Sequence, residues 1–335
     1  MFSGIKYYSR ILSSKITDIS LSPISGIRTD VRISRKIYIG IMASEKNFVF
    51  HLMAIFTVIV WGTTFVSTKI LIGHGLTAVD IFFYRFFLAY IFIWPFSSSR
   101  LFAKSKKDEL LFLAAGLCGG SFYFVAENTA LGITLASNVS LIISTTPILT
   151  ALLVFWFYRK EKLRPGLIYG SFLALSGVAF VVFNGSFILK ISPAGDLLTL
   201  LAALLWAFYC LILKQLDCQY SAMFMARKVF FYGLITLIPI FVFRPLNVDW
   251  DILRQPVVFS NLLFLGIIAS MLCYVIWNVV VRKLGAVRAA NYIYINPFVT
   301  LIASAIVLGE RITPIALLGC VFILCGVYLA EKRSS

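Results

Sequence analysis

Three ionisable side chains fall inside long apolar stretches of this 335-residue chain: Lys69, Arg85 and Glu127. An ionisable group at the centre of a membrane helix costs about 2.5–3.5 kcal/mol on insertion scales, so such groups mark substrate or ion pathways. Two cations and one carboxylate suit a zwitterion, because each end of the molecule meets an opposite charge. We therefore interpret Arg85 or Lys69 as a carboxylate-binding group. Glu127 is interpreted as a proton-coupling or ammonium-binding group.

The same three side chains also have a plainer interpretation. At about 1.5 Å rise per residue, each is expected within roughly 5–8 Å of the outer end of its helix, and all three then share one level. Long charged side chains near helix ends can reach the interface with their charged tips, without any role in transport. A pair formed by Arg85 and Glu127 would also lower the cost of burying either group.

A second set of polar side chains accompanies two prolines, Pro147 and Pro297, inside apolar stretches. Proline frees the carbonyl four residues before it, and unpaired backbone in a membrane must face protein or a water-filled cavity. We expect a central cavity lined by these two stretches, with Trp61 and Trp206 as aromatic walls. Interhelical hydrogen bonds and harmless kinks are the alternative. The polar residues concerned are Asn138, Thr145, Asn291 and Tyr294.

The elements that carry these residues are predicted from composition. Hydrophobic residues make up 60% of the chain and charged residues 13%, against about 45–50% and 25% in a soluble domain. A membrane helix needs about 20 mostly apolar residues. The apolar runs predict ten such helices, near residues 48–72, 80–98, 109–130, 135–157, 166–188, 196–214, 222–243, 259–281, 287–308 and 312–330.

The chain repeats itself at an offset of 149 to 150 residues. Six residues of the first half align with six of the second: Pro147, Thr150, Glu161, Pro165, Gly170 and Gly177 with Pro297, Thr300, Glu310, Pro314, Gly319 and Gly326. Five helices is an odd number, so the second copy enters the membrane from the opposite side. The predicted fold class is an all-α integral membrane protein, with ten transmembrane helices as two inverted-topology five-helix repeats at 48–188 and 196–330. Inverted repeats are typical of secondary transporters, whose substrate site lies where the repeats meet.

Lys and Arg concentrate in the loops on the side of the N-terminus. Such loops face the cytoplasm, so we expect both termini to be cytoplasmic and the protein to lie in a bacterial inner (plasma) membrane. Residues 1–45 form a basic, serine-rich segment that we expect to be a disordered tail. Met42 is an alternative start of the protein, and an organellar transit peptide is a further interpretation of the segment.

Three segments resemble the drug/metabolite transporter superfamily, and within it the EamA-type transporters with ten helices. They are Ala130–Asn138, Pro147, and Gly309-Glu310-Arg311-Ile312 ahead of Pro314. The resemblance covers about residues 48–330, and it implies a cavity lined by the fourth and ninth helices. The family's glycine–glutamate signature is incomplete in the first half, where Lys160-Glu161-Lys162 lacks the glycine.

The expected function is a secondary transporter that moves small metabolites by alternating access, with export of amino acids or related zwitterions as our specific prediction. The alternatives are an organic-anion facilitator and an exporter of drug-like cations, with an intramembrane enzyme as a distant third. We do not expect an enzyme, because the sequence offers no buried Ser/His or His/Asp set and no HExxH motif. It has no GxxxxGK[ST] loop either, so we expect no ATP hydrolysis. We expect no cofactor, metal or nucleic acid. The expected partners are the substrate, protons and membrane lipid, and the expected state is a monomer, with a homodimer as the alternative.

Overall fold

The structure is a computed structural model that divides into two compact units, Met1–Phe48 and Val49–Ser335. It describes residues 25–98, 100–134, 136–158, 165–183, 192–216, 219–243, 245–246, 249–308 and 313–331. For some of these it describes the backbone alone, namely 25–47, 136–138, 141, 181–183, 304, 308, 316 and 331. The signature segments around Glu161 and Glu310, and residues 1–24 of the basic tail, lie outside the described residues.

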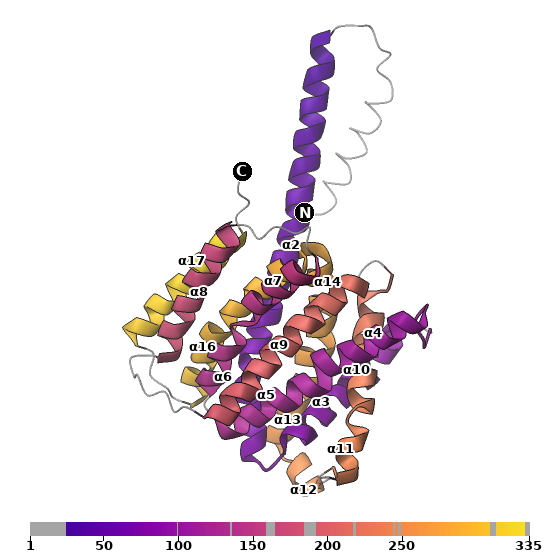
Figure 1. Ribbon diagram of the computed structural model, residues 1–335, viewed down its shortest axis with the longest axis vertical. Coiled ribbons are helices and arrows are strands. Elements are labelled where there is room, and N and C mark those ends of the chain that lie inside the picture. The colour runs from indigo at the N-terminus through magenta and orange to yellow at the C-terminus, as the bar shows by residue number, and fades with distance from the viewer. Residues whose placement is uncertain are drawn as a thin grey trace. The chain divides into compact units, whose positions relative to one another are not determined.

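The described elements are helices joined by turns and short loops, with no strand among them (Figure 1). They follow the ranges expected from the apolar runs, except that the first helix already begins at Ser25. The first half contains α2 (Ser25–Gly73), α3 (Ala78–Ile93), η1 (Trp94–Phe96), α4 (Lys106–Gly116), η2 (Leu117–Ser121), α5 (Phe122–Ile133), α6 (Ala136–Ile143), α7 (Thr146–Phe157) and α8 (Pro165–Phe183). The second half contains α9 (Pro193–Leu216), α10 (Ala222–Ile235), α11 (Ile238–Phe243), α12 (Trp250–Leu253), α13 (Pro256–Leu263), η3 (Phe264–Leu272), α14 (Cys273–Leu284), α15 (Ala286–Asn291), η4 (Tyr292–Ile295), α16 (Asn296–Leu308) and α17 (Pro314–Glu331).

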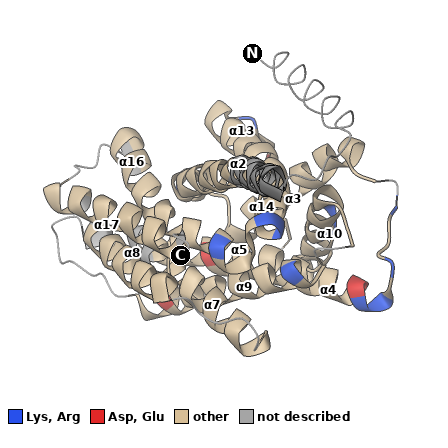
Figure 2. Ribbon diagram, turned by 90° about the horizontal axis from the view of Figure 1, so that it is seen from above, with Lys and Arg blue, Asp and Glu red and all other residues tan. Residues whose placement is uncertain are grey.

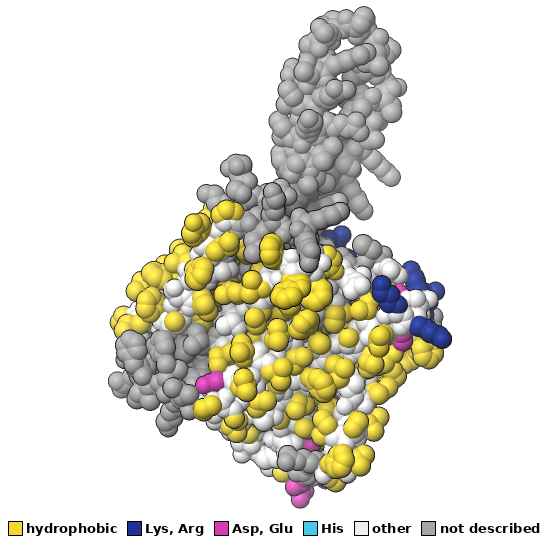
Figure 3. Space-filling view, viewed as in Figure 1, with side chains coloured by type: hydrophobic (Ala, Val, Ile, Leu, Met, Phe, Trp, Pro, Cys, Tyr) yellow, Lys and Arg dark blue, Asp and Glu magenta, His cyan; other side chains and the backbone are white. Residues whose placement is uncertain are grey.

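Seven helical stretches in the described part of the chain are long and apolar enough to cross a membrane: Phe48–Gly73, Ala78–Phe96, Lys106–Ile133, Pro193–Leu216, Ala222–Phe243, Pro256–Leu284 and Ala286–Val307. Three shorter apolar helices accompany them: Thr146–Phe157, Pro165–Phe180 and Leu317–Ala330. The described residues on the face shown in Figure 3 are mainly hydrophobic, and many large apolar side chains are exposed to the surroundings. A surface of this kind is stable in lipid and not in water, so the protein is an integral membrane protein.

Local sequence signals determine where several helices begin. Thr77 and Asp80 form a capping box at the start of α3, in which each side chain accepts a hydrogen bond from the backbone of the other. Ser105 and Ser221 cap α4 and α10 in the simpler way, by accepting one backbone N–H. These oxygens satisfy N–H groups that have no partner within the helix. Gly285, between α14 and α15, has a φ of 89°, a conformation that favours glycine.

Both prolines flagged in the sequence interrupt their helices. Pro147 follows the turn between α6 and α7, and Pro297 follows the 3-10 segment η4. The carbonyls that the prolines free nevertheless have partners inside the protein. The Thr146 hydroxyl donates to the carbonyl of Ile143 at 2.6 Å, and the backbone N–H of Asn296 donates to the carbonyl of Ile293. The interruptions therefore reshape the helices without leaving these carbonyls to be satisfied by water.

Two long spans each contain a π-helical segment, η2 and η3. In η3 the backbone N–H of Cys273 donates to the carbonyl of Ile268, five residues earlier, and to that of Ser270. A regular α-helix would direct this N–H to the carbonyl of Ala269. The Ala269 carbonyl is consequently free for another donor, which is the indole N–H of Trp61 at 2.9 Å. Isolated π segments of this kind are frequent at functional sites.

Glycines allow α8 and α17 to pack backbone against backbone. The two helices lie side by side (Figure 1). A Cβ built on Gly170 would stand 2.5 Å from the carbonyl oxygen of Gly326, and one built on Gly177 would stand 2.5 Å from that of Gly319. Close approach at small residues replaces the hydrophobic driving force that is missing inside a bilayer. These glycines therefore serve packing within one bundle.

We predict that Gly177→Ala destabilises the protein by about 1–3 kcal/mol, the usual cost of overpacking. The added methyl would meet backbone atoms of α17, which cannot rotate away. Thermal unfolding of the detergent-solubilised protein measures the effect. Gly132→Ala in α5 is the matched control, because nothing lies within 4 Å of a Cβ there. Equal unfolding midpoints for the two variants would contradict the close α8–α17 packing.

Candidate functional site

A cavity in the second unit is lined by side chains from six spans. The residues that bear on its chemistry are Trp61, Arg85, Glu127, Thr146, Trp206 and Asn296. The volume of this cavity is about 30 Å³. That is room for one or two waters. The side chains are therefore closed tightly around this space, and a larger occupant requires them to move apart.

Glu127 is the carboxylate of the cavity. It lies on α5 and is only 6% exposed. Tyr123 precedes it by one helical turn and donates its hydroxyl to Oε1 of Glu127 at 2.6 Å. Residues four apart on a helix lie on the same face, so the sequence itself places this donor beside the carboxylate. The second carboxylate oxygen is left for the cavity.

Arg85 is the cation of the cavity, and two neighbours hold it. Its Nε donates to the Ser270 hydroxyl at 2.9 Å, and its guanidinium carbon lies 4.1 Å from the centre of the Phe124 ring. A cation–π contact of this kind stabilises a desolvated cation by about 2 kcal/mol. No ion pair within 4.0 Å joins Arg85 to Glu127, although both side chains are described and buried. The pair that the sequence suggested is therefore absent, and the two charges face one cavity separately.

Aromatic side chains form much of the remaining wall. The rings of Trp61 and Trp206 meet edge to face, with centroids 5.0 Å apart. Trp277 and Tyr274 pack behind them, at 5.0 Å and 6.1 Å from the Trp61 ring. Edge-to-face packing favours a fixed geometry. Since the Trp61 indole is also tied to the Ala269 carbonyl, the wall is rigid on this side.

The cavity contains four of the nine side chains that the sequence suggested: Trp61, Arg85, Glu127 and Trp206. Four others do not line it, namely Lys69, Thr145, Asn291 and Tyr294, and the side chain of Asn138 lies outside the described residues. Arg85 lies about 10 Å along α3 from its start at the usual helical rise, and it shares the cavity with one tryptophan from the middle of the span Phe48–Gly73 and one from the middle of α9.

The fourth and ninth helices contribute the residue just before each proline, which are Thr146 and Asn296. A turn at Ser144–Thr145 separates α6 from α7, and Thr145 lies in this turn. The Thr145 hydroxyl donates to the carbonyl of Ile142 at 2.7 Å. The position before proline is a sequence signal that could have identified both residues. Tyr123 had a signal too, its spacing from Glu127, whereas nothing in the sequence singles out Ser270 or Phe124.

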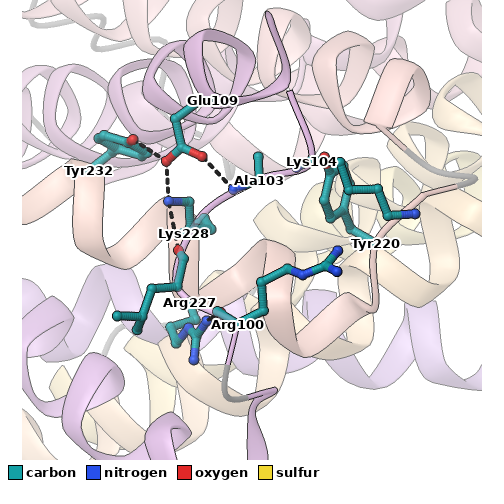
Figure 4. A network of polar contacts seen from close by, with 9 residues as sticks. Arg100, Ala103, Lys104, Glu109, Tyr220, Arg227, Lys228 and Tyr232 are labelled. Atoms are coloured by element: carbon teal, nitrogen blue, oxygen red, sulfur yellow. Dashed lines mark hydrogen bonds and ion pairs between the residues drawn. The ribbon is translucent and has the colours of Figure 1, made fainter. Parts of the chain in front are cut away.

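A second polar network lies where α4 meets α10 (Figure 4). Its centre is the carboxylate of Glu109, which pairs with Lys228 and accepts hydrogen bonds from the Tyr232 hydroxyl and, at 2.6 Å, from the backbone N–H of Ala103. Lys228 also donates to the carbonyl of Leu101 at 3.1 Å. The network ties the segment before α4 to the side of α10.

Further contacts fasten the same segment. Arg227 donates to the carbonyls of Ser98 and Arg100, and the backbone N–H of Lys104 donates to the Tyr220 hydroxyl at 2.8 Å. Several of the described Lys, Arg and acidic residues gather near α4 and α10 (Figure 2). Exposed basic side chains, Lys or Arg, lie along the same edge in the space-filling view (Figure 3). At this edge, backbone carbonyls of the segment before α4 accept hydrogen bonds from the buried cations Arg227 and Lys228.

We predict that Glu109→Gln destabilises the protein by about 1–3 kcal/mol, because it leaves the buried ammonium of Lys228 without its carboxylate. Lys228→Met in the same chain should recover part of that loss, since it removes the unpaired charge. A double-mutant cycle in thermal or urea unfolding measures the coupling. Additive effects of the two substitutions would show that the pair does not hold this segment.

Comparison with known proteins gives a consistent picture. The profile of the EamA-like transporter family matches the chain twice, over residues 49–183 and 193–331. A protein of Archaeoglobus fulgidus described as an uncharacterized transporter is 28% identical, over 84% of this chain and 97% of its own. One of Salmonella typhimurium described as a probable amino-acid metabolite efflux pump is 27% identical, over 83% of this chain and 93% of its own. A solved structure described as "Crystal structure of protein" shares the fold, with a TM-score of 0.66 and 16% identity over 85% of this chain and 98% of that one.

Proposed function

We propose that this chain, which belongs to the EamA-like transporter family, is a secondary transporter that exports amino acids or related zwitterions by alternating access. The observation that carries the proposal is that Arg85 and Glu127 are buried in one cavity without pairing with each other. Two opposite charges left apart in a low-dielectric site lose much of the attraction that would offset their desolvation. A zwitterion between them supplies a partner to each.

The two alternative substrate classes each satisfy only one of these charges. An organic anion would pair with Arg85 and place negative charge near Glu127, and an organic cation would do the reverse. A relative described as a probable amino-acid metabolite efflux pump supports the zwitterion as well. Glu127 is also placed to carry the coupling proton, because a carboxylate that alternates between charged and neutral forms changes its attraction for an ammonium group.

The proposal includes ten membrane helices arranged as two inverted repeats. The two separate family matches support a duplication. Corresponding irregularities support it further, because η2 and η3 interrupt the long spans of the two halves, and the α6–α7 turn and η4 interrupt the spans containing the prolines. Irregular helix segments near the middle of paired spans are characteristic of transporters with inverted repeats.

Alternating access requires one end of the cavity to be closed while the other opens. The Glu109–Lys228 network joins α4 of the first half to α10 of the second, so it is a contact that relative motion of the halves would break. We place this basic end in the cytoplasm of a bacterial cell, with both termini on that side, since cytoplasmic loops are rich in Lys and Arg. The proposed working unit is a monomer in contact with membrane lipid.

The orientation has a direct test in intact cells with a membrane-impermeant thiol reagent. Asp251→Cys, in the exposed helix α12, should react without lysis, because that loop is expected outside. Lys106→Cys, at the opposite end, should react only after lysis. The unsubstituted chain reports background from its native cysteines. The reverse labelling pattern would invert the proposed direction of transport.

The transport activity is tested in proteoliposomes that contain only this protein. We expect saturable flux of labelled L-amino acids that a proton gradient accelerates. Glu127→Gln should lower the rate at least about tenfold and flatten its pH dependence, since general proton-transfer groups contribute factors of this size or more. Asp251→Asn is the control, because it removes an exposed carboxylate far from the cavity.

Each result of this experiment has a separate meaning. Unchanged rate and pH dependence in well-folded Glu127→Gln would remove the coupling role of Glu127 while leaving transport intact. Flux of organic anions or cations in place of zwitterions would replace the proposed substrate class. Absence of flux for the whole panel of amino acids would refute amino-acid transport.

A further inference from the structure

We infer that the cavity binds a carboxylate end-on, through the two terminal nitrogens of Arg85. Ser270 is the positioning residue that holds the guanidinium group of Arg85 in the orientation this requires. The inference rests on the proposed function, which it deepens by naming the recognised group. The substrate class is then a carboxylate-bearing molecule, and its amide or ester is excluded. Attraction to positive charge alone would also favour a carboxylate over a neutral amide or ester, but it would not make the size of that preference depend on Ser270.

The first step concerns the edges of the guanidinium group. An arginine can bind a carboxylate side-on, through Nε and one terminal nitrogen, or end-on, through both terminal nitrogens. The Nε of Arg85 is already used, because it donates to the Ser270 hydroxyl at 2.9 Å. Ser270 is fully buried and Arg85 is 1% exposed, so water does not compete for this hydrogen bond. The two terminal nitrogens, which we call the fork, therefore remain available to a carboxylate.

The second step concerns the plane of the group. The Phe124 ring lies 4.1 Å from the guanidinium carbon, which covers one face. A hydrogen bond at Nε and a ring against one face together fix both the direction and the plane of the fork. Among the described residues, neither terminal nitrogen has a hydrogen-bond partner, and Arg85 lines the cavity. The fork is therefore held in position before a substrate arrives.

The third step explains why Ser270 stands at this point. It lies in the π-helical segment η3, directly after Ala269, whose carbonyl is free for the Trp61 indole. Two successive residues of η3 thus hold the cation and the aromatic wall of the cavity. In a regular α-helix the Ala269 carbonyl would be occupied by the N–H four residues later. The irregular segment is what places both anchors in the cavity.

The chemistry of the fork predicts its selectivity. Two parallel N–H groups match the two oxygens of a planar carboxylate, which gives geometric specificity in addition to charge. A carboxamide presents an NH₂ group to the same edge, so donor meets donor. Sites built around such hydrogen bonds discriminate strongly, because an unmatched analogue leaves buried groups unpaired. We expect the wild-type protein to prefer an amino acid over its amide by at least about 100-fold.

The test measures binding of three probes to the purified full-length protein, by titration calorimetry or by quenching of the cavity tryptophans. The probes are L-leucine, L-leucinamide and 4-methylpentanoate, which lacks the ammonium group. Ser270→Ala should lower the preference for leucine over leucinamide about tenfold, the loss of one hydrogen bond of about 1.4 kcal/mol. The affinity for leucinamide should stay unchanged, which a merely structural role would not predict. Ser270→Thr, which keeps the hydroxyl, should retain the preference.

Ser121→Ala is the matched control. Ser121 is fully buried in the other π segment, η2, and its hydroxyl bonds to that of Thr236 at 2.7 Å, outside the cavity lining. This variant loses the same type of contact and should keep the wild-type preference. Arg85→Lys is a second measurement that does not depend on Ser270. It retains the charge but replaces the fork by a single ammonium, so the preference should fall there as well.

The outcomes separate this inference from the proposed function. An unchanged preference in both Ser270→Ala and Arg85→Lys would overturn end-on recognition while leaving amino-acid transport in place. Binding of 4-methylpentanoate but not of leucine would support the fork and refute the zwitterion. Equal affinity of the wild type for leucine and leucinamide, or no binding of either carboxylate probe, would overturn the inference outright.

Discussion

The constraint on which the rest of the structure depends is the cost of holding a cation and a carboxylate inside a membrane bundle. Neither Arg85 nor Glu127 neutralises the other, so each must be compensated by its own surroundings. For Arg85 these are a hydroxyl and a ring face, and for Glu127 a phenol one turn away. Charges of this kind persist only where function requires them. The surrounding helices can accordingly be understood as the means of supplying these few compensating groups.

Irregular backbone is how the helices supply them. A regular helix already uses each interior carbonyl for one backbone hydrogen bond, so a carbonyl released by an irregular segment is a better acceptor for a neighbouring side chain. The π segment η3 releases one carbonyl for Trp61, and the turn before Pro147 brings Thr146 to the cavity wall. A membrane tolerates such departures where the backbone is buried in protein. Irregular segments occur in both halves, namely η2 and the α6–α7 turn in the first and η3 and η4 in the second.

The two polar networks differ in what they leave unsatisfied. Around Glu109 the carboxylate has an ammonium, a phenol and a backbone N–H, so the network is complete and holds one end of the molecule together. In the cavity the fork of Arg85 has no partner among the described residues. Complete networks rigidify a structure, whereas incomplete ones are costly unless a ligand completes them. This contrast is why we assign a structural role to the first and binding to the second.

The sequence by itself determined the class of the protein, the ranges of most helices and the charged and aromatic residues of the cavity, because apolar run length and buried charge are properties of the residue list. Only the tertiary structure decided that Arg85 and Glu127 stand apart, that Lys69 lies elsewhere, and that Ser270 holds the cation. These depend on contacts between segments up to 185 residues apart. They depend also on turns that shift a helical face by one residue, which periodicity alone does not foresee.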